Sequence, residues 1–83
     1  MGKYDPLGGY LRRLKTDSVD LGFAEIERIL GAMLPKSAQR PQWWANQIDP
    51  QGRHVQTRAW REAGYDAFPE AGAERVRFVR RQV

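Results

Sequence analysis

The segment Arg75-Val76-Arg77-Phe78-Val79-Arg80 alternates basic and apolar side chains, and it decides which fold class the chain can adopt. Successive side chains of a β-strand point to opposite faces, so Val76 and Phe78 would face a core while the arginines face solvent. The run Tyr65-Asp66-Ala67-Phe68 precedes it and is typical of a second short strand. Pro69-Glu70-Ala71-Gly72-Ala73, between the two, has the composition of a turn. The sequence therefore predicts a C-terminal β-hairpin.

Two helices are expected in the first part of the chain. The first begins at Asp5-Pro6, because aspartate can cap exposed amides and proline lacks the N–H that a first turn leaves unpaired. The second spans Phe23 to Leu30 and carries an apolar stripe at helical spacing. Gly31 is a natural C-terminal stop for it. The residues of the stripe are Phe23, Ile26, Ile29, Leu30 and Met33.

A third helix is expected from Arg53 to Ala63, with Gly64 as its stop. The preceding residues 36–42 are typical of a polar connector that Pro41 closes. Ser18-Val19-Asp20-Leu21 alternates polar and apolar residues, as a short strand does. This strand would join the hairpin in a small antiparallel sheet.

Together these elements predict an α+β fold, with three short helices and a small antiparallel sheet that includes the C-terminal β-hairpin. The order, helices followed by a two-stranded wing, is also that of a winged helix. A chain of 83 residues is the size of one domain, which we place at residues 1–83.

The composition narrows the classes of protein that fit. The absence of cysteine rules out disulfides and thiolate metal sites. No apolar run approaches the roughly 20 residues that a membrane-spanning helix needs, and the N-terminus lacks the apolar stretch of a signal peptide. We therefore expect a cytoplasmic protein with no membrane partner. The net charge is +4, which favours a polyanionic partner.

No motif for catalysis or for metal or cofactor binding is present. His54 is the only histidine, and no second ligand stands at a spacing that zinc would need. Ser18 and Ser37 do not lie in a G-x-S-x-G context, and Gly8-Gly9 is not part of a phosphate-binding loop. We expect a protein that is not an enzyme and that has no catalytic residue, metal or cofactor.

The segment Arg40-Pro41-Gln42-Trp43-Trp44-Ala45-Asn46 departs from what folding alone requires. Two adjacent tryptophans cannot share one face of a strand or one stripe of a helix, so one of them should be partly exposed. We expect Trp44 and Trp60 to belong to the core. Trp43 and Asn46 would then face a ligand.

DNA is the partner that the residues of this region suit best. Arginine binds phosphate and guanine edges, asparagine and glutamine bind adenine edges, and aromatic rings stack on bases. On the third helix, Gln56, Thr57 and Arg61 could enter a major groove as a recognition helix does. The predicted nucleic-acid-binding residues are Arg40, Trp43, Asn46, Gln56, Arg58, Arg61, Arg77 and Arg80.

An ordered set of motifs covers nearly the whole chain. It runs from Lys3-Tyr4-Asp5-Pro6-Leu7 through Trp43-Trp44-Ala45-Asn46 to Val76-x-Phe78-x-Arg80. Between these lie Phe23-x-Glu25-Ile26-Glu27-x-Ile29-Leu30-Gly31, Leu34-Pro35-x-Ser37-Ala38 and Gln56-x-x-Ala59-Trp60-x-x-Ala63-Gly64. The chain thereby resembles a family of small bacterial domains of unknown function, which occur alone or attached to larger proteins such as GIY-YIG-type nucleases. The resemblance implies a role connected with DNA by association and supplies no catalytic residues.

Two other functions stay open at the level of sequence. The exposed tryptophan and arginines suit a protein interface, where both residue types are enriched. One version of it is a homodimer in which the C-terminal strand pairs with a second chain. The third possibility is a small-molecule pocket roofed by Trp43 and Trp44.

Overall fold

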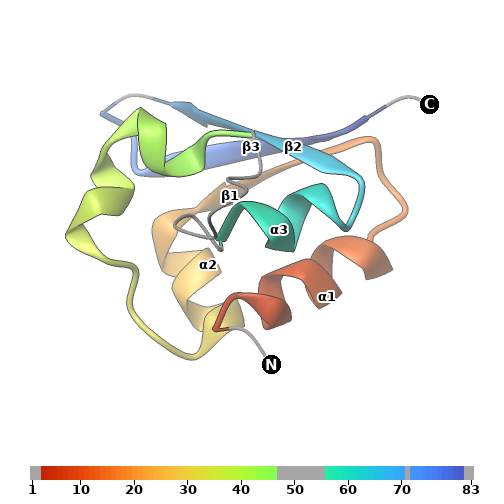
Figure 1. The fold of residues 1–83 in the computed structure, drawn as a ribbon, viewed down its shortest axis with the longest axis horizontal. Coiled ribbons are helices and arrows are strands. Elements are labelled where there is room, and N and C mark those ends of the chain that lie inside the picture. Colours follow the sequence, from red (N-terminus) through yellow and green to blue (C-terminus); the bar gives the residue numbers. More distant parts are fainter. Residues whose placement is uncertain (1–2, 47–55, 71, 82–83) are drawn as a thin grey trace.

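The computed structural model describes residues 3–46, 56–70 and 72–81. Its helices and strands confirm the α+β class, and the helices cover one face of a three-stranded antiparallel sheet (Figure 1). The elements are, in chain order, α1 (Asp5–Arg13), β1 (Ser18–Gly22), α2 (Phe23–Leu30), η1 (Lys36–Gln39), η2 (Pro41–Trp44), α3 (Gln56–Arg61), β2 (Tyr65–Glu70) and β3 (Arg75–Arg80).

The sheet has the strand order β1-β3-β2, so the C-terminal strand β3 lies in its centre. Val19, Phe78 and Ala67 stand opposite one another across the three strands. The predicted hairpin and the predicted addition of the 18–21 segment are both confirmed. Both edges of β3 already pair within the chain, so this strand has no free edge for the homodimer that the sequence suggested through it.

The predicted alternation along β3 is confirmed. Val76 and Phe78 are fully buried, whereas Arg75 and Arg77 are exposed on the outer face of the sheet. Pro69 lies within β2, although the sequence pattern placed it in the turn. A proline is tolerated there because β2 is an edge strand, in which alternate N–H groups need no partner.

The two long helices begin and end close to where the sequence predicts. Asp5 is the first residue of α1, and Tyr4 holds the cap position that the sequence assigned to Asp5. Helix α2 spans Phe23–Leu30 as predicted, and Gly31 ends it in the left-handed conformation at φ 69°. Met33 was expected in the apolar stripe but is 79% exposed, because it lies beyond the end of that helix.

Two further differences concern the middle of the chain. The expected polar connector consists of the 3₁₀ helices η1 and η2, and η2 includes both tryptophans of the pair. Helix α3 is described from Gln56 to Arg61, and Gly64 follows it with a φ of 88°. The predicted start of this helix at residues 53–55 lies outside the described residues, as does His54.

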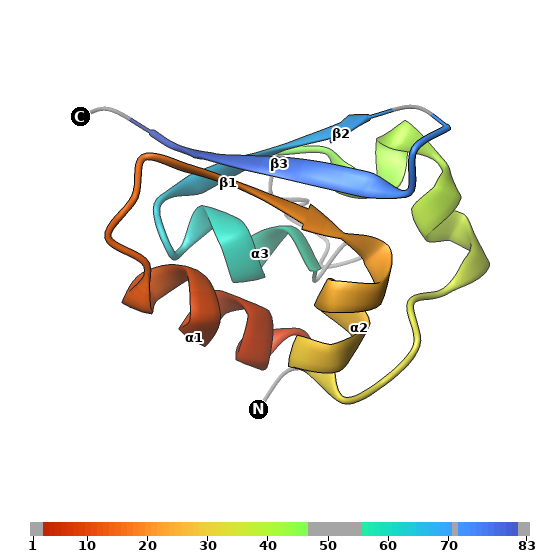
Figure 2. The ribbon, with the colours of Figure 1, turned by 180° about the vertical axis from the view of Figure 1, so that it is seen from behind.

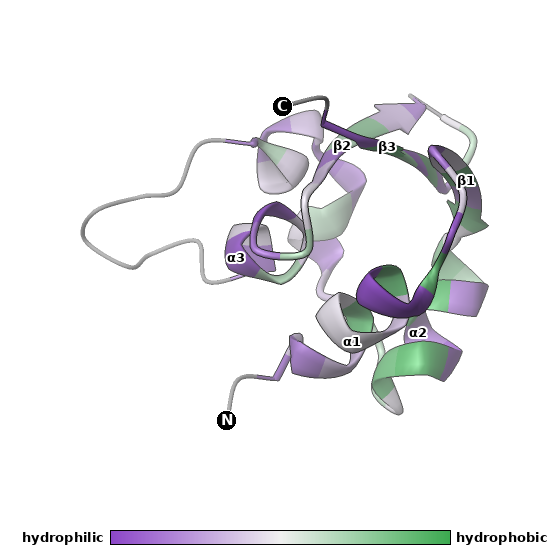
Figure 3. Ribbon diagram, turned by 90° about the vertical axis from the view of Figure 1, so that its right-hand side faces the viewer, coloured by the Kyte–Doolittle hydropathy of each residue, from purple (hydrophilic) through white to green (hydrophobic). Residues whose placement is uncertain are grey.

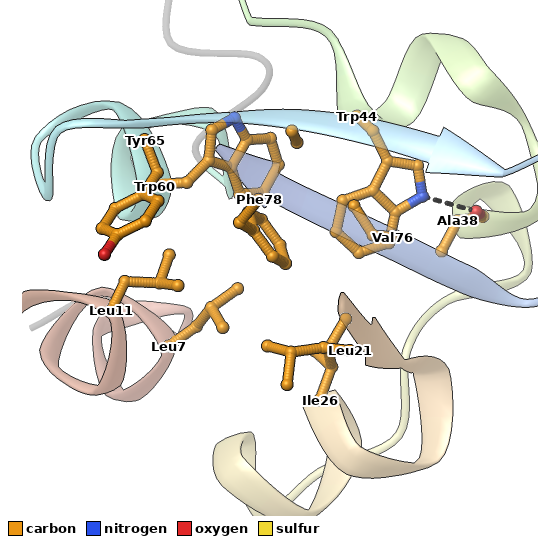
Figure 4. Packing of buried hydrophobic residues seen from close by; sticks show 11 residues of the cluster. Leu7, Leu11, Leu21, Ile26, Ala38, Trp44, Trp60, Tyr65, Val76 and Phe78 are labelled. Carbon is orange, nitrogen blue, oxygen red and sulfur yellow. Dashed lines mark hydrogen bonds between the residues drawn. The ribbon is translucent and has the colours of Figure 1, made fainter. Parts of the chain in front are cut away.

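The core lies between the sheet and the helices (Figure 4). Trp44 and Trp60 are its two largest side chains and are stacked, with 5.4 Å between their ring centroids. The Nε1–H of Trp44 donates to the carbonyl of Ala38, 2.8 Å away, which fastens η2 to η1. The other buried apolar residues are Leu7, Leu11, Leu21, Ile26, Ala38, Tyr65, Ala67, Val76 and Phe78.

Candidate nucleic-acid interface

The two adjacent tryptophans differ in burial. Trp44 and Trp60 are buried, which confirms their assignment to the core. Trp43 is half-buried and meets Trp44 edge-on, at 4.6 Å between ring centroids. The ring of Tyr4, ahead of α1, contacts the far side of Trp43 at 5.6 Å, also edge-on. Trp43 thus connects the core to the surface.

Asn46 was predicted to face a ligand, and the structure places its amide inside the fold instead. Its Nδ2 donates to the carbonyl of Ala67 at 2.9 Å, and its Oδ1 accepts from the N–H of Ala67 at 2.7 Å. The same Oδ1 accepts from Trp60 Nε1 at 3.0 Å. The side-chain amide therefore pairs with the edge of β2 as a neighbouring strand would, and it satisfies a buried indole.

Gln56 and Thr57 were expected on a face of α3 that could enter a DNA groove, and this expectation is wrong. Both residues are buried. Gln56 Nε2 donates to the carbonyl of Trp43 at 3.1 Å, and Thr57 Oγ1 donates to the carbonyl of Ala45 at 3.0 Å. These side chains hold the backbone of the tryptophan segment. We call Trp43, Trp44, Ala45 and Asn46, with Gln56, Thr57 and Trp60, the tryptophan corner.

Three of the predicted arginines form ion pairs within the chain. Arg61 Nη1 lies 2.9 Å from the Asp66 carboxylate, in a partly buried pair. Arg77 Nε lies 2.8 Å from the carboxylate of Asp20 on the outer face of the sheet. The hydrogen bond from this guanidinium lowers the pKa of Asp20 below its usual value. Arg58 forms an exposed pair with Glu62 at 3.6 Å, one turn further along the chain.

Arg80 joins segments that are distant in sequence. Its Nη2 donates to the carbonyl of Leu14 at 2.9 Å, and its guanidinium lies 5.6 Å from the ring centroid of Tyr65. The Tyr65 hydroxyl donates to the carbonyl of Thr16, and the backbone N–H of Arg81 donates to Gly64. These bonds hold residues 12–17, 61–66 and 80–81 together, and we call this region the basic end.

The basic end carries an excess of positive charge. Six cationic side chains stand there against three carboxylates. Arg12, Arg13 and Lys15 are exposed and have no ion pair with any residue in the described part of the chain. Figure 3 looks onto this end and shows hydrophilic segments at the ends of α1 and β3. The cations are Arg12, Arg13, Lys15, Arg61, Arg80 and Arg81, and the carboxylates are Asp17, Glu62 and Asp66.

The opposite end of the molecule has no such excess. It comprises residues 25–28, 36–40, 70 and 72–75, joined by bonds such as that from Gln39 Nε2 to the Glu74 carboxylate at 2.7 Å. Four cations face four carboxylates there. The cations are Arg28, Lys36, Arg40 and Arg75, and the carboxylates are Glu25, Glu27, Glu70 and Glu74.

A groove between α1 and α3 leads away from the basic end. Its cavity volume is about 510 Å³, and Arg12 and Arg58 stand on its two walls. The helices approach closely because Gly8 has no side chain: a Cβ there would lie 2.9 Å from the carbonyl oxygen of Ala59. Burial raises the pKa of the Tyr4 phenol at the far end. Lys3 and Arg12 line this groove but were not among the binding residues predicted from sequence. The spacing could have indicated Arg12, which lies one helical turn beyond Gly8 and two turns beyond Asp5.

A second, smaller groove of about 350 Å³ lies beside Trp43. Arg40 lines it together with Ser37 and Gln42, so it brings together two of the eight predicted residues. Trp44 is buried and does not line this groove. The small-molecule pocket expected under both tryptophans therefore has only Trp43 beside it. The eight predicted residues therefore do not form one surface.

The described residues hold neither a metal-binding cluster nor a helix that could span a membrane. No cluster of three histidine, cysteine or carboxylate side chains could hold an ion within residues 3–46, 56–70 and 72–81. No helix in the same ranges is long and apolar enough to cross a bilayer.

Comparison with known proteins places the chain in a family. No curated protein and no solved structure matches it. A family model described as "domain of unknown function (DUF7662)" matches residues 4–82, which span α1 to β3 and include the basic end. The chain therefore belongs to the DUF7662 family of domains of unknown function.

Proposed function

We propose that the chain is a non-enzymatic DNA-binding module that contacts the phosphate backbone through its basic end. The observation that carries the proposal is the difference in charge between the two ends. Six cations face three carboxylates at the basic end, and four face four at the other. A uniformly basic protein would not separate its charge in this way, whereas a surface that meets a polyanion benefits from it.

The exposed arginines of the basic end have the geometry that phosphate requires. Arg12 and Arg13 lie in the last turn of α1, and neither guanidinium has an ion-pair partner in the described ranges. A free planar guanidinium can bind two phosphate oxygens at once. The α1–α3 groove adjoins this surface, and Arg58 on its other wall is paired with Glu62, which also lines the groove.

The order of the elements supports the same proposal. Helix, strand, two helices and a hairpin follow one another in the order of a winged helix. The resemblance to domains attached to GIY-YIG-type nucleases adds an association with DNA.

The tryptophan corner changes what kind of DNA binding we propose. Asn46 and Gln56 are the amides that could read adenine edges, and both are used inside the fold. Phosphate contacts fix register and orientation but carry no sequence information. We therefore propose binding to duplex DNA with little sequence preference, rather than the base reading that the sequence suggested.

The test is fluorescence anisotropy with labelled duplexes of two unrelated sequences, titrated at several salt concentrations. The double variant Arg12→Gln/Arg13→Gln should weaken binding to both duplexes equally. It should also reduce the slope of log affinity against log salt by about 2, because each arginine that neutralises a phosphate adds roughly 1 to that slope.

The matched control is Arg28→Gln/Lys36→Gln, which removes the same charge from the opposite end. Both of these residues are exposed. This control should leave affinity and salt slope close to those of the unmodified chain. Absence of binding at low salt would refute the proposal. An equal decrease in affinity for the two double variants would mean that net charge alone, and not the basic end, is responsible.

A further inference from the structure

The two edge strands of the sheet, β1 and β2, differ in how many outward-pointing N–H and C=O groups lack a partner within the described residues. The hydrogen bonds of Asn46 show which residues direct these groups outward. Asn46 binds both the N–H and the C=O of Ala67, so both groups point away from β3. The backbone groups of successive residues in an antiparallel strand point to alternate sides. Phe78, opposite Ala67, therefore directs its own groups toward β1, where it pairs with Val19.

The same alternation determines the outer edge of β1. Val19 and Leu21 bind β3, so the N–H and C=O groups of Ser18 and Asp20 point outward. Two bonds beyond the strand ends follow the same register, from Arg80 N to Asp17 O at 2.7 Å and from Phe23 N to Glu74 O at 2.8 Å. Within the described residues, no hydrogen bond is formed by these four outward groups of Ser18 and Asp20.

The edge of β2 is closed at its centre, around Ala67, and the edge of β1 is open. Asn46 occupies the outward groups at Ala67, and Pro69, two residues on, has no N–H to offer. Edge strands are commonly protected by proline and by covering segments. Figure 2 shows β1 at the near edge of the sheet, and no element in the described ranges lies outside it.

We propose that β1 pairs with β1 of a second copy of the chain, antiparallel and around a two-fold axis at Val19. Ser18 of each copy stands opposite Asp20 of the other. The outward groups of these two residues then form four hydrogen bonds between the copies, because two hydrogen-bonded pairs exchange two bonds each. The result is a continuous sheet of two three-stranded halves, with the helices of both copies on the same face.

The side chains favour this register over its neighbours. Ser18 and Asp20 both point to the outer face, so a serine hydroxyl of one copy can donate to a carboxylate of the other. If the two-fold axis lay at Asp20 instead of Val19, the two Asp20 carboxylates would stand directly opposite each other, which is unfavourable. On the inner face the half-buried Val19 of each copy would cover the other.

The strand is short, and the dimer is therefore weak. β1 has five residues, and such an edge buries less area than the roughly 1,200 Å² of a stable interface. We expect the dimer to form at chain concentrations between micromolar and millimolar, with rapid exchange between monomer and dimer. The pairing does not depend on DNA binding, since Arg12 and Arg13 do not belong to β1.

Amide hydrogen exchange followed by NMR tests the pairing directly in the unmodified chain. The amides of Ser18 and Asp20 should gain protection at least tenfold between micromolar and millimolar concentration. The amides of Val19 and Leu21, which bind β3, serve as internal controls and should be protected equally throughout. Unchanged exchange of Ser18 and Asp20 up to millimolar concentration overturns the proposal.

The variant Ser18→Pro provides a second test, because the N–H that it removes points outward and binds nothing within the described fold. It should raise the dimer dissociation constant at least tenfold, measured by sedimentation equilibrium, while the circular dichroism spectrum stays the same. The control Ser18→Ala keeps the N–H and should weaken the dimer much less. Equal dissociation constants for Ser18→Pro and the unmodified chain would contradict the proposal even if both folded normally.

Discussion

The polar side chains of the tryptophan corner and the exposed arginines of α1 at the basic end are used in opposite ways. In the corner, the amides of Asn46 and Gln56 and the hydroxyl of Thr57 bind neighbouring backbone groups. At the basic end, Arg12 and Arg13 extend into solvent without an ion pair to any described residue. A polar group with internal partners builds the fold, whereas one without them is available to a ligand. Stability should therefore depend on the corner, and binding on the basic end.

The largest expected effect is that of Asn46→Ala on stability. The change leaves Trp60 Nε1 and both backbone groups of Ala67 without their partner. Unsatisfied buried groups cost about 1–3 kcal/mol each, and access to water offsets part of this, so we expect a decrease of about 3 kcal/mol in the free energy of unfolding. Urea denaturation measures it. Gln42→Ala, at an exposed neighbour, should change stability by less than about 0.5 kcal/mol, and similar decreases for both variants would remove the structural role of Asn46.

The second prediction is that alanine substitutions at two adjacent glycines of α1 change stability in opposite directions. In Gly8→Ala the new Cβ meets the carbonyl oxygen of Ala59 at 2.9 Å, so α1 and α3 must move apart at a cost of about 1–3 kcal/mol. In Gly9→Ala nothing lies within 4 Å, and helix propensity should add about 0.5–1 kcal/mol of stability. Thermal unfolding of the two variants should thus shift in opposite directions. A shift in the same direction would show that the helices are not in contact at Gly8.

A third prediction concerns the stability of the basic end. Arg12→Gln/Arg13→Gln should leave the free energy of unfolding within about 0.5 kcal/mol, because both side chains are exposed and unpaired among the described residues. Urea denaturation measures the effect of this double variant on stability, and the DNA titration measures its effect on binding. A large decrease in the stability of this variant would mean that these arginines support the fold, and the contrast with the tryptophan corner would fail.

The smallest expected effect is the acid dependence of the Asp20–Arg77 pair. Its hydrogen bond lowers the pKa of Asp20 in the folded state, so the stabilisation is present above the unfolded pKa of about 4 and is lost as pH falls through the folded value. Asp20→Asn should lower the melting temperature slightly at neutral pH, since the pair is exposed. This difference should shrink as the solution is acidified. A difference that grows in acid would contradict the assigned direction.

The helices and strands could be predicted because their signals are local. The apolar stripe of α2 and its glycine stop lie within nine consecutive residues, and the alternation of β3 lies within six. Alternation also predicted that the 18–21 segment is a strand of the sheet, whereas its place beside β3 comes only from the structure. The error at Met33 arose because the spacing continued past Gly31, where the helix had already ended.

The candidate site could not be predicted in the same way, because the bonds that decide it join residues distant in sequence. Asn46 and Ala67 are 21 residues apart, and Arg80 and Leu14 are 66 apart. An amide that can read a base edge is chemically the same as one that pairs with a strand, so its residue type does not tell the two apart. The basic end likewise exists only because three separate segments meet.

The closed edge of β2 also determines how far an assembly of this chain can grow. If only β1 can pair, two copies satisfy each other and the assembly ends at a closed two-fold pair. If Asn46 left its position, the β2 edge would open, and β1 of one copy could pair with β2 of the next without limit. One side-chain amide would then separate a closed dimer from a filament. Light scattering of Asn46→Ala over time, at a concentration where the unmodified chain stays clear, would reveal such growth.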